Sequence, residues 1–265
     1  CRLVVCKVLD ERGDGNVAAM IEGIRYVLDT RRIYHTRILN ISVGIGSIRE
    51  AALEQELLSW IAKAWNAGLF VAVAAGNNGP APDSVSAMGL QAHVVSVGCH
   101  DGRQTPGHKN ACAAYSGRGP ANGRVKKPDL VAPGKNIMAC SPGAGNLYSM
   151  KSGTSMSTPL VSGAIALALE KDPLLTNLEV KMMLWESTED MGLPRNQQGW
   201  GNVMYIPAAP MCEKNLAYAQ KVKIALEKGA SPGDFPREDY EASWQGRFTL
   251  EDLNIHGKRA LGMPV

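Results

Sequence analysis

The chain has 265 residues, of which 45% are hydrophobic and 20% charged, which is enough apolar material for a large core and excludes wholesale disorder. Its 28 basic and 25 acidic residues leave a formal net charge of +3, too balanced for a protein that binds nucleic acid through a basic surface. No apolar run reaches the roughly 18 residues that a membrane span needs. We therefore expect neither a nucleic acid nor a membrane as a partner.

The cysteines are few for a chain of this length, and none forms a C-x-x-C pair, which argues against a structural zinc site or a dithiol redox motif. A chain of this size gains its stability from its core, so we expect all six cysteines to be thiols. That expectation favours a cytoplasmic location, with a secreted one as the alternative. The six are Cys1, Cys6, Cys99, Cys112, Cys140 and Cys212.

Apolar runs alternate with helical periods along residues 1–207. The predicted strands are 2–9, 37–43, 69–75, 93–98 and 136–140, and the predicted helices are 17–30 and 48–67. This alternation predicts an α/β fold with a doubly wound, mostly parallel sheet and helices on both of its faces. In such sheets the functional groups lie in loops beyond the carboxyl ends of the strands. The glycine-rich strand exits at 42–46 and 74–79 are therefore the candidate site.

The two ends of the chain differ in character from its middle. The first residues already have a strand pattern, with no initiator Met and no signal peptide, so we expect the chain to be part of a longer protein. After Pro207 the pattern changes to one predicted helix, 213–228, followed by an irregular stretch. We therefore expect residues 1–207 to form one domain and residues 208–265 to be a C-terminal extension of unknown role.

The polar turn at residues 10–16 has the acidic and glycine residues of a calcium loop, but only in part. Arg12 and Ile21 occupy two of the positions that an EF-hand loop gives to ligands, so we reject a calcium site there. No other carboxylate cluster is visible in the sequence. We expect no metal ligands among these residues.

Ser155 is the first candidate for chemistry, because it stands where a loop of small residues enters an apolar helix. Pro159 suits the first turn of that helix, since its missing N–H has no partner there in any case. Unpaired N–H groups and the positive end of the helix dipole would stabilise an oxyanion formed when the serine hydroxyl attacks a carbonyl. Taken alone, the segment fits an ordinary serine N-cap better.

The segment 153–159, Gly-Thr-Ser-Met-Ser-Thr-Pro, resembles the nucleophile motif of the subtilisin-like serine proteases. Other segments resemble those of the same family, in the family's order. They are Lys7–Leu9, Asn40–Gly44, Ala74–Gly79, Tyr115–Pro120 and Lys127–Gly134. The resemblance covers roughly residues 1–207 and is closest to the cytoplasmic and clostridial-type subtilases.

The resemblance implies a serine endopeptidase in which Ser155 attacks the scissile carbonyl and forms an acyl-enzyme. Asn77 would donate its side-chain amide to the oxyanion, together with the Ser155 backbone N–H. The implied substrate-binding residues form two groups, for which ordinary sheet core is the alternative. Ser42, Val43 and Gly44 would pair with a peptide or protein substrate as an added strand, and Ala74, Ala75 and Gly76 would form one wall of the P1 pocket.

The family's catalytic Asp and His lie upstream of the position that Cys1 occupies, and neither of their motifs is present here. We expect the five histidines to be surface or loop residues: His35, His93, His100, His108 and His256. The general base and its Asp are then expected from sequence upstream of Cys1, and this chain alone should be close to inert.

The competing hypothesis is a non-catalytic pseudoprotease that binds peptides or regulates a partner through the strand at Ser42–Gly44. No cofactor is required for the proposed chemistry. Relatives often carry structural calcium, but this sequence shows no site for it.

Overall fold

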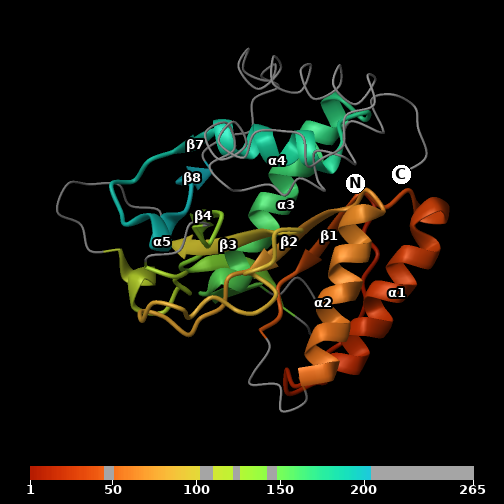
Figure 1. The fold of residues 1–265 in the computed structure, drawn as a ribbon, viewed down its shortest axis with the longest axis horizontal. Coiled ribbons are helices and arrows are strands. Elements are labelled where there is room, and N and C mark those ends of the chain that lie inside the picture. Colours follow the sequence, from red (N-terminus) through yellow and green to blue (C-terminus); the bar gives the residue numbers. More distant parts are fainter. Residues whose placement is uncertain (45–50, 102–109, 122–125, 142–147, 204–265) are drawn as a thin grey trace, which may run out of the picture.

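The computed structural model describes residues 1–44, 51–101, 110–121, 126–141 and 148–203, and Figure 1 shows its fold. The strands are β1 (Ile38–Ile41), β2 (Phe70–Ala74), β3 (Val95–His100), β4 (Leu130–Pro133), β5 (Ile137–Cys140), β6 (Tyr148–Lys151), β7 (Thr188–Glu189) and β8 (Asn202–Val203). The helices are α1 (Val17–Tyr34), α2 (Ala51–Asn66), the 3-10 helix η1 (Ala111–Ala114), α3 (Thr154–Lys171), α4 (Asn177–Glu186) and α5 (Arg195–Gln198).

Six strands form one sheet in the order β1-β2-β3-β4-β8-β7, in which only the β7–β8 pair is antiparallel. β5 and β6 form a separate antiparallel ribbon. Every residue of β2 and β3 is buried, which explains why β2 is a continuous apolar run and why β3 shows no alternation of polar and apolar residues. The prediction of a mostly parallel α/β sheet is confirmed.

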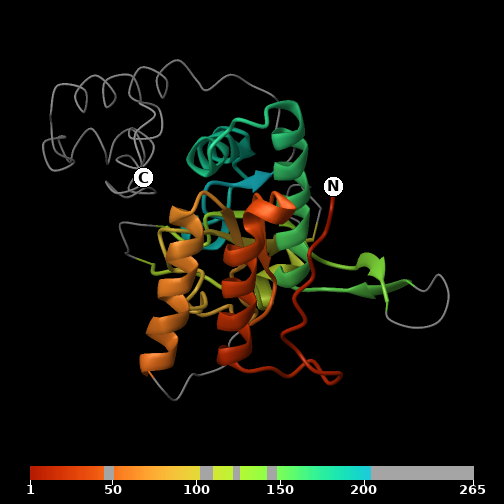
Figure 2. The ribbon, with the colours of Figure 1, turned by 90° about the vertical axis from the view of Figure 1, so that its right-hand side faces the viewer.

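Helices cover the sheet in two layers. α1 and α2 pack side by side, while α3 runs across β1, β2, β3 and β4 (Figures 1 and 2). α4 begins with a capping box, in which the Thr176 hydroxyl accepts from the Glu179 N–H and the Glu179 carboxylate accepts from the Thr176 N–H. None of the helices in the described ranges has an apolar stretch of bilayer-spanning length.

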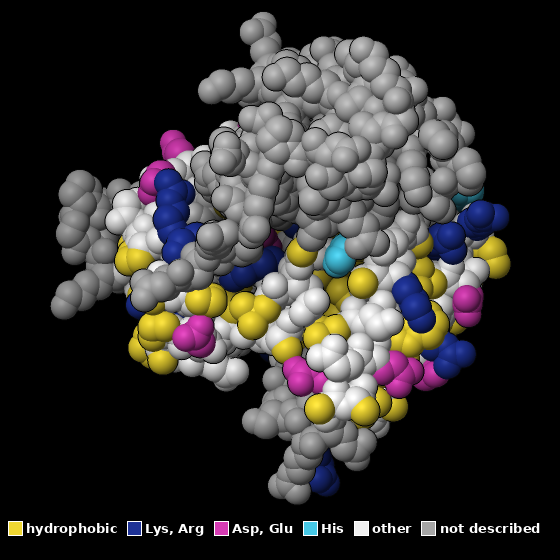
Figure 3. All heavy atoms as spheres, viewed as in Figure 1, with side chains coloured by type: hydrophobic (Ala, Val, Ile, Leu, Met, Phe, Trp, Pro, Cys, Tyr) yellow, Lys and Arg dark blue, Asp and Glu magenta, His cyan; other side chains and the backbone are white. Residues whose placement is uncertain are grey.

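The charged side chains are mixed over the face of the described residues that Figure 3 shows. Lys and Arg side chains lie on both sides of that face, and Asp and Glu side chains lie between them (Figure 3). No single basic patch forms on this face, in agreement with the balanced charge of the sequence.

The prediction of a strand at residues 2–9 is wrong. Cys6 and Val8 pack against the core, while Leu3 and Val5 are each 84% exposed, so the side chains alternate as they do in a strand. In the described part of the chain, however, no strand lies beside the segment, which forms only an isolated bridge with the following turn. A strand needs a neighbour for its backbone hydrogen bonds, and the segment has none.

Two of the further differences between the predicted and the observed strands have one cause. The predicted strand at 93–98 is shifted by two residues to Val95–His100, and β4, like β6, β7 and β8, was not predicted. Both follow from one buried cluster, in which the Asp129 carboxylate accepts hydrogen bonds from the Ser96 N–H, the Ser96 hydroxyl and the Lys127 ammonium. This long-range cluster aligns β3 with β4, and hydrophobic periodicity carries no signal for it.

The prediction that all six cysteines are thiols is wrong for two of them. Cys99 and Cys112 form a disulfide. Cys1, Cys6 and Cys140 are free, and Cys212 lies outside the described residues. A low cysteine density does not reveal that β3 and η1 fold against each other. The cytoplasmic location rested on six thiols and stays an untested prediction.

The predicted helix at 213–228 and the domain boundary after residue 207 also lie outside the described residues.

Candidate active site

A pocket of about 300 Å³ opens where the carboxyl ends of β1 and β2 meet the first turn of α3. It brings together residues that are more than a hundred positions apart in the sequence. The lining residues are Gly44, Ala74, Gly76, Asn77, Asn78, Ser86, Thr154 and Ser155. Five of the eight predicted site residues are therefore in the lining, and Asn78, Ser86 and Thr154 are lining residues that the sequence analysis did not select.

Ser155 is the second residue of α3, and the N-cap position belongs to Gly153, which has no side chain to cap with. The interpretation of Ser155 as an N-cap is therefore wrong. At the start of α3, the Thr154 N–H donates to Asn77 Oδ1 and the Met156 N–H donates to the Gly153 carbonyl. Between them, the Ser155 N–H has no acceptor among the described residues, so it is available to a ligand.

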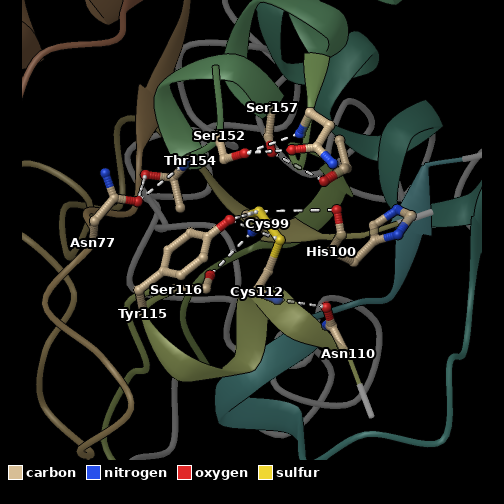
Figure 4. Close-up of a disulfide and its surroundings, with 12 residues drawn as sticks. Asn77, Cys99, His100, Asn110, Cys112, Tyr115, Ser116, Ser152, Thr154 and Ser157 are labelled. Carbon is tan, nitrogen blue, oxygen red and sulfur yellow. Dashed lines mark hydrogen bonds between the residues drawn. A yellow bond between two sulfur atoms is a disulfide. The ribbon is translucent and has the colours of Figure 1, made fainter. Parts of the chain in front are cut away.

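Asn77 faces the start of α3. Its Oδ1 accepts from the Thr154 N–H at 3.0 Å and from the Thr154 hydroxyl at 3.2 Å (Figure 4). These two bonds fix the orientation of the amide and leave Nδ2 without an acceptor among the described residues. A Cβ at Gly153 would lie 3.2 Å from Nδ2, so glycine keeps this approach open. The free amide N–H groups and the Ser155 N–H can together donate to one oxyanion.

Pro159 does not lie in the first helical turn as predicted, because α3 begins at Thr154 and makes Pro159 its sixth residue. Proline has no N–H for the carbonyl four positions earlier, which is that of Ser155. The Thr158 hydroxyl instead donates to the Thr154 carbonyl at 2.8 Å. The backbone near Ser155 is thus held by side chains as well as by the helix.

The predicted substrate-binding residues have different surroundings. Gly44 is exposed and lines the pocket, whereas Val43 packs against the core and Ser42 accepts a hydrogen bond from Asn40 Nδ2. Ala74 and Gly76 line the pocket, whereas Ala75 is fully buried and does not. The pocket wall is therefore formed by part of each predicted group, and none of these placements tests a role in substrate binding.

One histidine differs from its prediction as a surface or loop residue. His100 ends β3, is 2% exposed, and has its Nε2 2.6 Å from Asn202 Oδ1. Its imidazole points away from Thr154 (Figure 4). His35 caps α1 and His93 precedes β3, as predicted, while His108 and His256 lie outside the described residues. No histidine is among the lining residues of the pocket, so none in the described part is placed as a base for Ser155.

In the ranges that the structure describes, no three His, Cys, Asp or Glu side chains gather where they could bind one metal ion. The described residues thus show no cluster of such side chains for the structural calcium that relatives often carry.

The parallel α/β sheet, together with a serine at a helix start opposite an asparagine amide, defines a protein of the subtilisin class. The family model described as "Subtilase family" matches residues 1–201, and the chain belongs to this family. Serine protease AprX of Bacillus subtilis (strain 168) is 34% identical over 204 residues, which cover 71% of this chain and 46% of AprX. The solved structure of Sphericase has a TM-score of 0.63 at 24% identity, covering 74% of this chain and 66% of that one.

A second similarity concerns the C-terminal part of the chain. The family model described as "Gig2-like" matches residues 187–263. The "Uncharacterized protein YbiU" of Escherichia coli (strain K12) is 90% identical over 70 residues, which are 26% of this chain and 17% of YbiU. The chain thus spans less than half the length of AprX and less than a fifth of YbiU.

Proposed function

We propose that this chain is the nucleophile-bearing portion of a serine endopeptidase, which hydrolyses peptide bonds through an acyl-enzyme on Ser155. The observation that carries the proposal is the pair of free donors, the Ser155 N–H and Asn77 Nδ2, beside the Ser155 side chain in one pocket. Membership of the subtilase family supports serine protease activity in general.

The chemistry needs a base that the described residues do not supply. The Ser155 hydroxyl would add to the scissile carbonyl carbon as its proton passes to an imidazole, and the carbonyl oxygen would become an oxyanion bound by the two donors. Collapse would break the C–N bond, with the same proton passing to the leaving amine. Water would then hydrolyse the acyl-enzyme by the same route.

We assign the base and its orienting Asp to sequence upstream of Cys1. The segment at residues 1–9 supports this assignment, because it keeps a strand-like alternation although the described residues place no strand beside it, and within those residues β1 pairs only with β2. In subtilisin, removing the histidine lowers turnover by about 10⁶-fold, so residues 1–265 alone should show almost no activity.

Labelling with a fluorophosphonate probe tests the proposal. Residues 1–265 should react slowly, and the same chain joined to its upstream segment should label rapidly and cleave a peptide substrate. Ser155→Ala in the longer protein should abolish both signals, whereas Ser162→Ala, a half-buried serine of α3 outside the pocket lining, should abolish neither.

Rapid labelling of residues 1–265 would show that a base exists within these residues and would refute the split arrangement. A longer protein that binds peptides but neither labels nor cleaves them would favour the pseudoprotease hypothesis.

A further inference from the structure

The Cys99–Cys112 disulfide lies near the candidate active site, and the proposed function gives it no role. It joins β3 to η1 with the two Cα atoms 5.7 Å apart. Both cysteines are buried, at 2% and 0% exposure. β3 is buried along its whole length and pairs with both β2 and β4, so it is held firmly. The disulfide therefore ties η1 to a fixed part of the sheet.

Tyr115 connects the disulfide to the residues that follow η1. Its hydroxyl lies 3.0 Å from Cys112 Sγ and 3.3 Å from Cys99 Sγ, and because disulfide sulfurs have no proton, the hydroxyl is the donor (Figure 4). Burial raises the pKa of Tyr115, and the Asp101 carboxylate raises it further, so the donated proton is kept at neutral pH. Ser116 adds a second link, since its Oγ accepts from the Cys99 N–H at 3.0 Å.

The backbone of the same segment holds the loop that carries Asn77. The Gly79 N–H donates to the Tyr115 carbonyl and the Gly117 N–H donates to the Gly76 carbonyl, each at 2.8 Å. These two bonds bracket Asn77 on both sides. The packing is close, because a Cβ at Gly79 would lie 2.2 Å from the carbonyl oxygen of Ser116. A displacement of residues 115–117 must therefore displace the Asn77 loop.

The disulfide also contacts the residue that supports the start of α3. A Cβ at Gly134 would lie 2.8 Å from Cys99 Sγ and 2.2 Å from Ser157 Oγ, so Gly134 fits tightly between them. The Gly134 carbonyl accepts from the Gly153 N–H at 2.8 Å, directly before Thr154. The disulfide thus lies beside two residues, Tyr115 and Gly134, that bond to the backbone segments carrying the oxyanion donors.

We propose that the Cys99–Cys112 disulfide and the Tyr115 hydroxyl are positioning groups that hold Asn77 at its distance from Ser155. This role rests on the proposed function, since it concerns oxyanion stabilisation in that same pocket. A small displacement of a preorganised donor lowers turnover far more than it lowers substrate binding, because the oxyanion exists only in the transition state.

A disulfide in this positioning role makes the site sensitive to redox state. A dithiol reductant would break the Cys99–Cys112 S–S bond and transfer two electrons and two protons, leaving two thiols and the oxidised reductant. Two thiol sulfurs cannot stay at bonding distance. Because β3 is held on both sides, η1 would move, and Tyr115 with it.

The first experiment maps the cysteines without reference to activity. Alkylation of residues 1–265 under denaturing, non-reducing conditions, followed by digestion and mass spectrometry, should find Cys99 and Cys112 linked. Cys1, Cys6 and Cys140 should be alkylated. Alkylation of both Cys99 and Cys112 would overturn the inference.

The second experiment measures kcat and KM in the protein that includes the upstream segment. Cys99→Ser/Cys112→Ser should lower kcat by about 10–100-fold with little change in KM, and Tyr115→Phe should lower it by about 3–10-fold. Tyr34→Phe, on the exposed end of α1, is the matched control and should change neither constant. In an Asn77→Ala background both losses should shrink to about 2-fold or less, because the donor that they position is gone.

Losses that persist in full in the Asn77→Ala background, or that appear in KM, would overturn the positioning role. Should the cysteine pair fail to fold when replaced, Tyr115→Phe still decides the question, since it keeps the ring and removes only the hydroxyl. An inactive parent protein would refute the proposed function. An active parent with unaffected Tyr115 and cysteine variants would refute this inference alone.

Discussion

At the scale of single residues, Asn77 shows how one amide can serve structure and chemistry at once. Its oxygen accepts two hydrogen bonds from Thr154, which fixes the side chain before any substrate binds. Its nitrogen has no acceptor among the described residues and lies beside Gly153. A donor fixed in this way needs no reorganisation when an oxyanion forms, which is why its contribution is expected in turnover.

The prediction for Asn77 separates these two functions. In the protein with its upstream segment, Asn77→Ala should lower kcat by about 10²–10³-fold, the range known for the equivalent donor of a subtilisin, with KM nearly unchanged. Asn77→Asp keeps an oxygen toward Thr154 but removes the amide donor, so its kcat should fall as far. Steady-state kinetics on a peptide substrate measure both constants. Unchanged turnover in either variant would remove Asn77 from the site.

His100 is a second residue whose surroundings lead to a prediction, here for the pH dependence of stability. Burial lowers its pKa from the ordinary value of 6.5, although the hydrogen bond to Asn202 and the Asp101 carboxylate oppose that shift. The folded protein therefore keeps His100 neutral at a pH where the unfolded chain already binds a proton. The contribution of neutral His100 to the free energy of unfolding is therefore fully present above about pH 6.5. It decreases as the pH falls from there toward the lowered pKa of the folded protein.

We expect the free energy of unfolding, from urea titrations between pH 7.5 and 5, to decrease with falling pH. His100→Gln should make that decrease shallower, because glutamine can still bond to Asn202 but does not titrate. An identical pH dependence in His100→Gln would show that His100 does not cause it.

At the scale of elements, the edge of the sheet at β1 and the segment at residues 1–9 lead to the same prediction. The described part of the chain places no strand against the outer side of β1, and the segment exposes Leu3 and Val5. Unpaired strand edges and exposed apolar side chains promote association between copies of a chain. The same two features supported the assignment of the base to an upstream segment.

Residues 1–265 alone should therefore associate or be poorly soluble, and size-exclusion chromatography with light scattering can measure this. Leu3→Lys/Val5→Lys should shift the chain toward the monomer, because the exposed apolar side chains of the segment are replaced by charged ones. Leu174→Lys, in the loop between α3 and α4, changes an equally exposed leucine and should have no such effect. A chain that is monomeric without these substitutions would contradict the prediction.

At the scale of the whole molecule, two family similarities meet within one chain. The subtilase similarity ends at residue 201 and the Gig2-like similarity begins at residue 187. β8 lies just after the first limit, yet it pairs with β4 and β7, and its Asn202 bonds to His100. Contacts in the described structure thus make residues 202–203 part of the subtilase domain.

Truncation tests the domain boundary. A chain ending at residue 207 should keep the cooperative urea unfolding of residues 1–265, since it retains β8. A chain ending at residue 201 should unfold at a clearly lower urea concentration, because it loses the β4–β8 pairing and leaves His100 buried without Asn202. Equal stability of the two truncations would show that β8 contributes little to the domain.

Local sequence patterns were sufficient to predict several strands and helices of this protein and its fold class. Buried strands such as β2 and amphipathic helices such as α1 follow from short-range periodicity, and the resemblance of residues 153–159 to a family motif pointed to Ser155 without any tertiary information. Strand–helix alternation then sufficed for the fold class, because parallel neighbours require helical crossovers.

Features that depend on contacts between residues far apart in the sequence were decided only by the tertiary structure. It shows residues 2–9 without a ladder, His100 buried against β8, and Cys99 bonded to Cys112 in η1. It also shows Asn77 held by Thr154, 77 positions away in the chain. The sequence determines which residues favour a strand, a helix or a polar bond, but pairing, burial and cross-linking depend on which distant segments meet, and that is decided only when the sheet assembles.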